Sequence, residues 1–242
     1  MVNATDATYP PYEYVAPDGH TVVGMDPDIM EAIGKQLNLT ISQKNSSFAT
    51  IIPGLSDGKY DIGMSSFIDT AARQKQVDFV TYAHGASGFY IKTGAGKSYN
   101  GLSSLCGAKV AVENGTVQQA SAQAQAKKCT STGKPTVTTL AFADQNSANL
   151  ALSSGRADIG FADAGLISYV VKQSNGAFAA TGSPLPDEAE TAIALPKGNG
   201  MTKAIQAALQ QMIKSGEYMK ILKKWGTQSE AVTTSMINVA KG

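Results

Sequence analysis

The sequence predicts an α/β fold of two βαβ lobes joined by a two-strand hinge. An internal echo is the main observation: Leu55-Ser-Asp-Gly-Lys-Tyr-Asp-Ile-Gly63 and Leu152-Ser-Ser-Gly-Arg-Ala-Asp-Ile-Gly160 are nearly the same sequence. In each copy an apolar helical run ends at a glycine that can adopt a left-handed conformation, and a short buried strand follows. A helix-turn-strand unit therefore occurs twice, and the βαβ rhythm restarts between the copies.

The length of 242 residues suits two modest domains better than one. We expect residues 1–87 and 190–242 to form the first lobe and residues 88–189 to form the second. A strand at 88–91 leads away from the first lobe, and a strand at 191–195 carries the chain back. Two crossings of this kind predict a hinge rather than a loose linker.

Turn and helix signals predict the remaining elements of the first lobe. Pro17-Asp-Gly-His20 joins two short strands as a hairpin. Pro27 suits the first turn of a helix that runs to about Leu37, because apolar residues recur there at helical spacing. A strand near 39–43 follows, and the next helix ends at Gly58. The other expected elements are a strand at 109–112, a helix at 117–128, a strand at 136–140, and amphipathic helices at 201–215 and 217–226.

Composition argues against two classes of partner. The formal net charge is +1 and only 16% of residues are charged, whereas a nucleic-acid binder shows a basic face. The 43% of hydrophobic residues occur in short runs, with no apolar stretch of the roughly 18 residues that span a bilayer. The first residues lack a charged and apolar leader, so we expect that any secretion signal was removed or never present.

The two cysteines, Cys106 and Cys129, favour a local disulfide over a pair of buried free thiols. They lack CxxC spacing and clustered histidines, which makes a metal site improbable, and no cofactor is expected. A bond across this loop would stabilise the protein by about 3 kcal/mol and implies an oxidising compartment.

Polar residues follow each copy of the echo, at the point where each strand ends. Ligands of open α/β sheets bind beyond the carboxyl ends of strands, so both copies would contribute to one crevice. Arg73 follows the first copy, and its guanidinium matches a carboxylate with two parallel hydrogen bonds. Asp163 follows the second and could accept from an ammonium group. The alternatives are a solvated helical turn for Arg73 and an ordinary helix N-cap for Asp163.

Further candidates each have a structural alternative. Tyr9, Tyr12 and Phe48 could wall a ligand or pack in the core. Asp6 could join the site or simply cap a turn. Thr116 precedes a helix, so it could hold an anion or serve as an ordinary N-cap. Recognisable motifs of nucleophilic or metal-dependent catalysis are missing.

Several short motifs follow one another along essentially the whole chain. They are Tyr9-Pro-Pro-Tyr12-Glu13, Val23-Gly-Met-Asp-Pro-Asp28, Ile52-Pro-Gly-Leu55, Gly58-Lys-Tyr-Asp61, Thr70-x-x-Arg73, Val77-Asp-Phe79, Gly115-Thr116, Gly155-Arg-x-Asp158, Asp163 and Trp225-Gly226. In this order they resemble the family 3 extracytoplasmic solute-binding proteins of amino-acid ABC importers, of the type-II periplasmic-binding-protein fold. The resemblance implies a monomer in the periplasm or at the cell surface, with an amino acid-like ligand and an ABC permease as partners.

The resemblance also implies roles for individual residues. Arg73 would bind the ligand carboxylate, and Asp163 would accept from its α-ammonium. Ser66 and Thr116 would add backbone or hydroxyl contacts, and Tyr9 with Phe48 would enclose the ligand side chain. A zwitterion held in this way favours a closed state. The other residues assigned to the ligand site are Asp6, Tyr12, Ser65, Phe67, Ile68 and Glu113.

Two positions bear on the choice of ligand. Relatives usually have a Thr or Ser hydroxyl where this chain has Ile68, followed by Asp69. Losing a hydrogen bond to a charged ligand group costs roughly 1.5 to 3 kcal/mol, so we hypothesise a site retuned toward a more apolar ligand. Glu113 pulls instead toward a cationic ligand, unless it is an exposed carboxylate at a strand end.

Three functions fit the resemblance. A solute-binding protein that captures a small zwitterion and presents it to an importer requires no covalent step. A cyclohexadienyl dehydratase-like enzyme would need a carboxylic acid to protonate a leaving hydroxyl, for which Glu113 is a loose candidate. The third is the ligand-sensing domain of a receptor. We expect the first.

Overall fold

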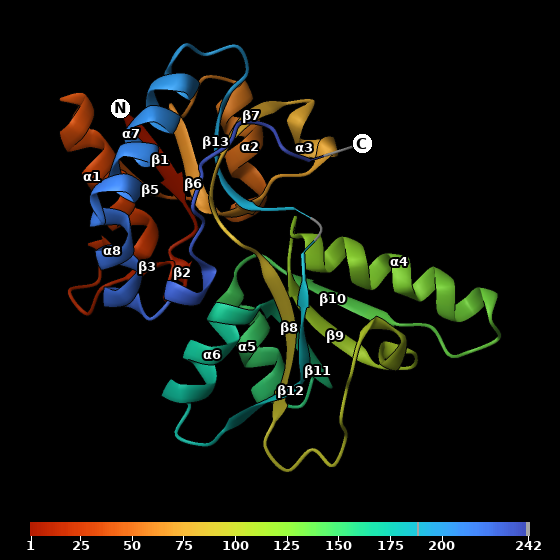
Figure 1. Cartoon of the computed structure of the whole chain (residues 1–242). Coiled ribbons are helices and arrows are strands. Elements are labelled where there is room, and N and C mark those ends of the chain that lie inside the picture. The colour runs from red at the N-terminus through yellow and green to blue at the C-terminus, as the bar shows by residue number, and fades with distance from the viewer. Residues whose placement is uncertain (188, 241–242) are drawn as a thin grey trace. The chain divides into compact units, whose positions relative to one another are not determined.

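The computed structural model describes residues 1–187 and 189–240. It divides into two compact units, Met1–Gly85 with Asp187–Gly242 and Ala86–Pro186, and the chain passes between them twice. A five-stranded sheet with helices on both faces forms the centre of each unit (Figure 1). The predicted α/β class is confirmed.

The returning strand lies inside the first unit's sheet rather than at its edge. The strand order is β5-β1-β6-β13-β7. β1 is parallel to β5 and β6, whereas β13 is antiparallel to β6 and β7. Thr191 of β13 is in register with both Ile68 and Ala83. The strands are β1 (Val2–Thr5), β5 (Ser42–Asn45), β6 (Ile62–Ile68), β7 (Val77–Ala83) and β13 (Thr191–Pro196).

Helices cover both faces of this sheet. α1, α7 and α8 pack together on one face, and α2 packs against β6 on the other (Figure 1). A small antiparallel sheet of β2, β3 and β4 contains the predicted hairpin. The elements are α1 (Met25–Leu37), α2 (Phe48–Ser56), α3 (Ala71–Gln74), α7 (Met201–Ser215), α8 (Glu217–Trp225), β2 (Thr8–Tyr9), β3 (Glu13–Val15), β4 (Val22–Val23) and the 3-10 turn η2 (Gln228–Glu230).

The second unit has a sheet of order β10-β9-β11-β8-β12. β9 is parallel to β10 and β11, and β8 is antiparallel to β11 and β12. α4 lies on one face, with α5 and α6 on the other (Figure 1). The elements are β8 (Ala86–Lys92), η1 (Leu102–Leu105), β9 (Lys109–Glu113), α4 (Val117–Ser131), β10 (Thr138–Phe142), α5 (Gln145–Ser153), β11 (Ile159–Asp163), α6 (Ala164–Gln173) and β12 (Phe178–Pro186).

The internal echo has a physical basis in both units. Gly58 and Gly155 have φ of +72° and +76°, in the region that favours glycine, just after α2 and α5. The aspartate of each copy accepts the amide at the start of a neighbouring parallel strand. Asp61 binds Val2 N at 2.7 Å, and Asp158 binds Lys109 N at 2.8 Å. The echoed residues thus end a helix and fix the first strand of the adjoining βα unit.

Two strand predictions are wrong in detail, and one strand was missed. The strand expected at 39–43 is β5, which starts at Ser42, because the preceding residues terminate α1: Asn38 has φ of +53° and Leu39 N donates to Gly34 O. The strand expected at 136–140 is β10, shifted by two residues. β12 was missed, because it is an edge strand with Gly182 and two prolines, which are weak strand formers.

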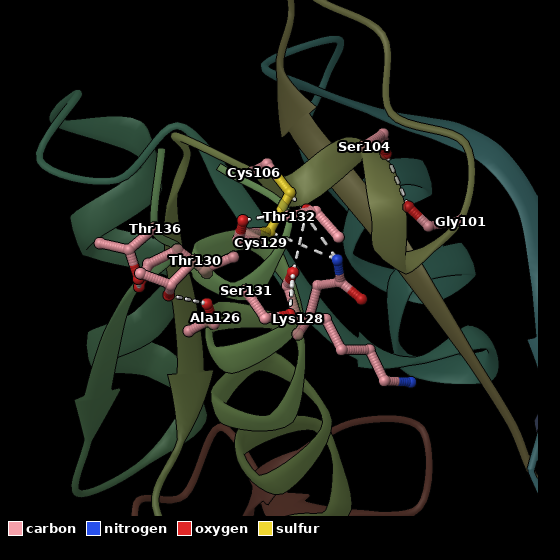
Figure 2. Close-up of a disulfide and its surroundings, with 12 residues drawn as sticks. Gly101, Ser104, Cys106, Ala126, Lys128, Cys129, Thr130, Ser131, Thr132 and Thr136 are labelled. Atoms are coloured by element: carbon pink, nitrogen blue, oxygen red, sulfur yellow. Dashed lines mark hydrogen bonds between the residues drawn. A yellow bond between two sulfur atoms is a disulfide. The ribbon is translucent and has the colours of Figure 1, made fainter. Parts of the chain in front are cut away.

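The predicted disulfide is confirmed. Cys106 follows η1 and is bonded to Cys129 of α4, at a sequence separation of 23 (Figure 2). The Gln125 amide lies 3.3 Å from the sulfur of Cys129, one turn away on the same helix. Cys129 is buried in the core of the second unit, so the bond ties α4 to the segment that precedes β9.

Replacing both Cys106 and Cys129 by alanine is expected to lower the free energy of unfolding by about 3 kcal/mol, because the open chain gains loop entropy. Urea denaturation of the variant and of the unreduced parent measures the difference. Reduced parent protein should match the variant. Equal stability of all three proteins would contradict a stabilising bond.

Candidate functional site

Arg73 lies over two stacked aromatic rings of the first unit. Its guanidinium carbon is 5.5 Å from the ring centre of Phe48 and 5.4 Å from that of Phe67, and the two rings are 4.5 Å apart. Nη1 donates to Ile68 O at 2.8 Å. Thr70 caps α3 by accepting from Arg73 N. Arg73 is therefore a half-buried, oriented cation and not a solvated helical turn.

Asp6 connects this aromatic pair to the start of the chain. Its side chain is 3% exposed, with one oxygen accepting from Phe48 N at 2.9 Å and the other from Thr8 Oγ1 at 2.7 Å. Asp6 N donates to Ser65 Oγ, which in turn donates to Glu13 Oε1 at 2.7 Å. Asp6 does cap a turn, as one alternative expected, but it also fixes the first residue of α2.

Ser66 has a φ of +48°, which is uncommon for a residue other than glycine and is typical of functional sites. Its amide donates to Asp26 Oδ2 at 3.1 Å. Asp26 also accepts from the Tyr82 hydroxyl at 2.8 Å. Because this bond crosses from α1 to β6, Asp26 helps to hold the strained backbone of Ser66 in place.

Glu13 and Asp26 are two buried acids that are hydrogen-bonded to Ser65 and Ser66, respectively. Both are fully buried: Glu13 accepts from the Ser65 hydroxyl, and Asp26 accepts from Ser66 N. Burial raises the pKa of Glu13 well above its ordinary value, and the charge of Asp26 adds to the rise. Burial raises the pKa of Asp26 to about 6. Neither residue was predicted to belong to the site, although both lie in motifs that carry the family resemblance.

The remaining first-unit candidates are buried. Tyr9 and Tyr12 stack with ring centres 6.1 Å apart, and the Tyr12 hydroxyl donates to Glu230 Oε1 at 2.9 Å. Ile68 is 5% exposed, and its Cδ1 would lie 2.9 Å from a Cβ added at Gly85. The structure thus brings Arg73, Phe48, Phe67 and Ile68 together directly, and hydrogen bonds link Asp6 and Ser65 to Phe48. Ser66 precedes Phe67 on β6 and is held by Asp26.

Asp163 is buried at the end of β11 in the second unit. It occupies the N-cap position of α6, yet its side chain makes no capping bond to that helix. Gln118 Nε2 donates to Asp163 Oδ1 at 2.6 Å and to Ser87 Oγ at 2.9 Å. Asp163 therefore takes the N-cap position that the alternative expected, but without the side-chain bond of an ordinary N-cap. Sequence reasoning missed Gln118 and Ser87, although Gln118 lies in the first turn of a helix that was predicted.

Glu113 is 2% exposed, which overturns the alternative of an exposed strand-end carboxylate. It ends β9, and Asp163 ends the neighbouring parallel strand β11, so both carboxylates lie at one edge of one sheet. Thr116 follows as the N-cap of α4: it accepts from Gln119 N and donates to Glu113 O at 2.8 Å. Its hydroxyl therefore acts as the ordinary N-cap that was the alternative.

Within the described residues, no group of three His, Cys, Asp or Glu side chains could hold a metal ion. No helix in the same part of the chain is long and apolar enough to cross a bilayer. The chemistry of the described residues is instead that of oriented ions: a guanidinium in the first unit and two buried carboxylates at one sheet edge in the second.

A family model described as bacterial extracellular solute-binding proteins, family 3, matches residues 1–228. The arginine-binding protein ArgT of Corynebacterium glutamicum is 28% identical over 95% of this chain and 75% of its own length. A putative ABC transporter arginine-binding protein 2 of Escherichia coli is 30% identical over 92% of this chain and 88% of its own.

Solved structures agree with these relatives. An ancestral arginine-binding protein bound to arginine has a TM-score of 0.84 and 32% identity, covering 93% of this chain and 97% of its own. An ancestral amino acid-binding protein, described as a precursor of cyclohexadienyl dehydratase, has a TM-score of 0.81 and 27% identity, with coverages of 93% and 94%. The predicted family resemblance is confirmed.

The buried acids predict that stability falls as pH rises. Burial raises the pKa of Glu230 from 4.5 to about 7 and that of Asp26 from 3.8 to about 6. Each group binds its proton more tightly in the folded chain, so its contribution is complete below about pH 4 and is lost as pH rises through the folded pKa. The free energy of unfolding should therefore decrease between pH 5 and pH 8.

Urea denaturation at pH 5, 6, 7 and 8 measures this trend. Glu230→Gln is the matched variant, because glutamine keeps an acceptor for the Tyr12 hydroxyl but does not titrate. The variant should lose part of the pH dependence between pH 6 and pH 8. A stability that rises with pH in the parent protein would contradict the assignment of raised pKa values.

Proposed function

We propose, because this chain belongs to the bacterial extracellular solute-binding proteins of family 3, that it captures a cationic α-amino acid and delivers it to an ABC importer. Arginine is the first candidate, since the relatives from Corynebacterium glutamicum and Escherichia coli are arginine-binding proteins. Such a ligand has three charged groups: a carboxylate, an α-ammonium and a side-chain cation. We assign each of them to an oppositely charged side chain of the protein.

The carboxylate of the ligand is assigned to Arg73. A guanidinium can donate two parallel hydrogen bonds to a carboxylate, which lysine cannot do. The aromatic rings of Phe48 and Phe67 and the bond to Ile68 O support this assignment, because they orient the guanidinium before any ligand arrives. An oriented side chain loses less conformational entropy on binding.

The α-ammonium group is assigned to Asp163. This carboxylate is buried and is oriented by the Gln118 amide, which Ser87 holds from its other side. An oriented carboxylate in a poorly solvated position favours a cation strongly.

A second cationic group of the ligand is assigned to Glu113, and this observation carries the choice of ligand class. Glu113 and Asp163 put two carboxylates at the same sheet edge, both at least nine-tenths buried. A ligand with two cationic groups offers one to each carboxylate. Tyr9, Tyr12 and Ile68 would supply apolar contacts to the aliphatic part of such a side chain.

Binding without catalysis is proposed for this site. The relative described as a precursor of cyclohexadienyl dehydratase is itself an amino acid-binding protein. Glu113 is the candidate acid for a dehydratase. A carboxylate that binds a ligand cation is ionised, whereas a general acid must carry a proton, so the two roles exclude each other. We further propose that the protein acts as a monomer outside the cytoplasmic membrane, with an ABC permease as partner. The family description supports that location.

Isothermal titration with arginine, lysine, ornithine, histidine, glutamine and citrulline tests the ligand class. Cationic amino acids should bind, and a ligand at a hundred times its dissociation constant should stabilise the fold by about 2.7 kcal/mol in a thermal-shift assay. Strong binding of a neutral amino acid with none of a cationic one would overturn the assignment. Steady conversion of prephenate or arogenate would establish the enzyme instead.

Glu113→Gln is expected to weaken arginine binding by about 10- to 100-fold, because a charge-assisted hydrogen bond becomes a neutral one. Citrulline, which has a neutral urea group in place of the guanidinium, serves as the matched ligand and should lose no more than about twofold. Titration calorimetry measures all four affinities. Equal losses for arginine and citrulline would place Glu113 away from the ligand side chain.

Arg73→Lys is expected to weaken binding of every α-amino acid that binds, by about tenfold or more, while the fold survives. Lysine keeps the charge but loses the two-pronged hydrogen bond to the carboxylate. Calorimetry gives the affinity, and circular dichroism confirms the fold. Arg156→Lys is the control, since the other arginine of the chain lies in the second unit against Phe142. Unchanged affinity in Arg73→Lys would remove Arg73 from the site.

A further inference from the structure

The last described residues, 229–240, lie beyond the part of the chain that the family model matches, and we call them the C-terminal strap. The strap runs antiparallel along β7, the edge strand of the first unit's sheet. Isolated bridges pair Ala83 with Ala231 and Val80 with Ile237. The strap thereby satisfies backbone groups along the edge of β7 that would otherwise face solvent.

The end of the strap is held by Asp69, which is fully buried. Asp69 Oδ2 accepts from Val239 N at 2.7 Å and from Ala240 N at 3.4 Å. The other oxygen accepts from Gln74 Nε2 at 2.7 Å. The carboxylate of Asp69 thus joins the strap to the final residue of α3. Val239 is 170 residues away from Asp69 in the sequence.

Arg73 lies between Asp69 and Gln74, whose side chains are hydrogen-bonded to each other. Asp69 precedes the N-cap residue Thr70, and Gln74 is the residue after Arg73. A four-residue helix has no stability of its own, because helix formation needs more turns than α3 has. Its shape must therefore come from side chains that bind its ends, and Asp69 binds both the last residue of α3 and the strap.

We propose that the C-terminal strap positions Arg73 for the ligand carboxylate and that Asp69 is the positioning residue through which it acts. This inference rests on the proposed function of Arg73. Without the strap amides, one oxygen of a buried carboxylate must draw in water or turn outward, and the bond from the other oxygen to Gln74 weakens with it. The guanidinium then samples more positions, so it loses more conformational entropy when the ligand binds.

Titration calorimetry of arginine against a double-mutant cycle tests the mechanism. Asp69→Ala and removal of residues 239–242 should each weaken binding by about tenfold, and the two changes together should cost little more than one. In an Arg73→Lys background, each change should cost less than about twofold. Equal losses in both backgrounds would overturn the proposal, because a general structural role does not depend on the guanidinium.

Asp144→Ala is the matched control. Like Asp69, Asp144 accepts from backbone and side-chain donors, in its case the amide and the hydroxyl of Ser147, but it caps α5 in the second unit. Its loss should lower the melting temperature while arginine affinity stays within about twofold. The same loss of affinity as in Asp69→Ala would assign the effect to stability alone and overturn the proposal. Asp69→Asn, which keeps one acceptor oxygen, replaces Asp69→Ala if the alanine variant does not fold.

Hydrogen exchange of the unliganded chain separates this proposal from the proposed function. Removal of residues 239–242 should speed exchange of the amides in residues 69–76 by at least about tenfold, with no change in the second unit. Unchanged exchange overturns the positioning role, whatever the ligand. If the parent chain binds none of the tested amino acids, the proposed function fails, while faster exchange still supports control of the Arg73 turn by the strap.

Discussion

The pairing of β13 with both β6 and β7 is the constraint on which the first unit depends. The chain leaves this unit after Gly85 and returns at Asp187, and the returning strand inserts into the sheet rather than adding to its edge. Register at Thr191 then fixes the ends of β6 and β7 relative to each other. Ser65, Ser66 and the Arg73 turn are placed by the same register, because they lie at or just after the end of β6.

Each unit contains a pair of buried acidic groups. The Glu13–Asp26 pair lies behind the left-handed backbone of Ser66, while Glu113 and Asp163 end adjacent strands of the second unit. Burying a carboxylate is costly unless hydrogen bonds offset the loss of water, and amides or hydroxyls supply such bonds here. For Glu113 and Asp163, the cationic groups of the proposed ligand would offset part of this cost.

The two echoed units show how similar scaffolds acquire opposite chemistry. Each has a glycine with positive φ and an aspartate that binds the first amide of a neighbouring strand. Beyond the strands the two copies differ: the first continues into α3, which contains Arg73, and the second ends in Asp163. The repeated frame can therefore carry different side chains at the strand ends of each unit.

The sequence by itself determined what local physics controls. Glycine conformation, apolar periodicity and the isolated cysteine pair predicted the α/β class, most elements and the disulfide, and ordered motifs predicted the family. It named Arg73 and Asp163 as candidates, but the tertiary structure alone decided their surroundings: the rings under Arg73, the Gln118 amide on Asp163, and the burial of Glu113. It alone revealed the bond from Asp69 to the strap. These contacts join residues far apart in sequence, and side-chain burial depends on packing that no local pattern encodes.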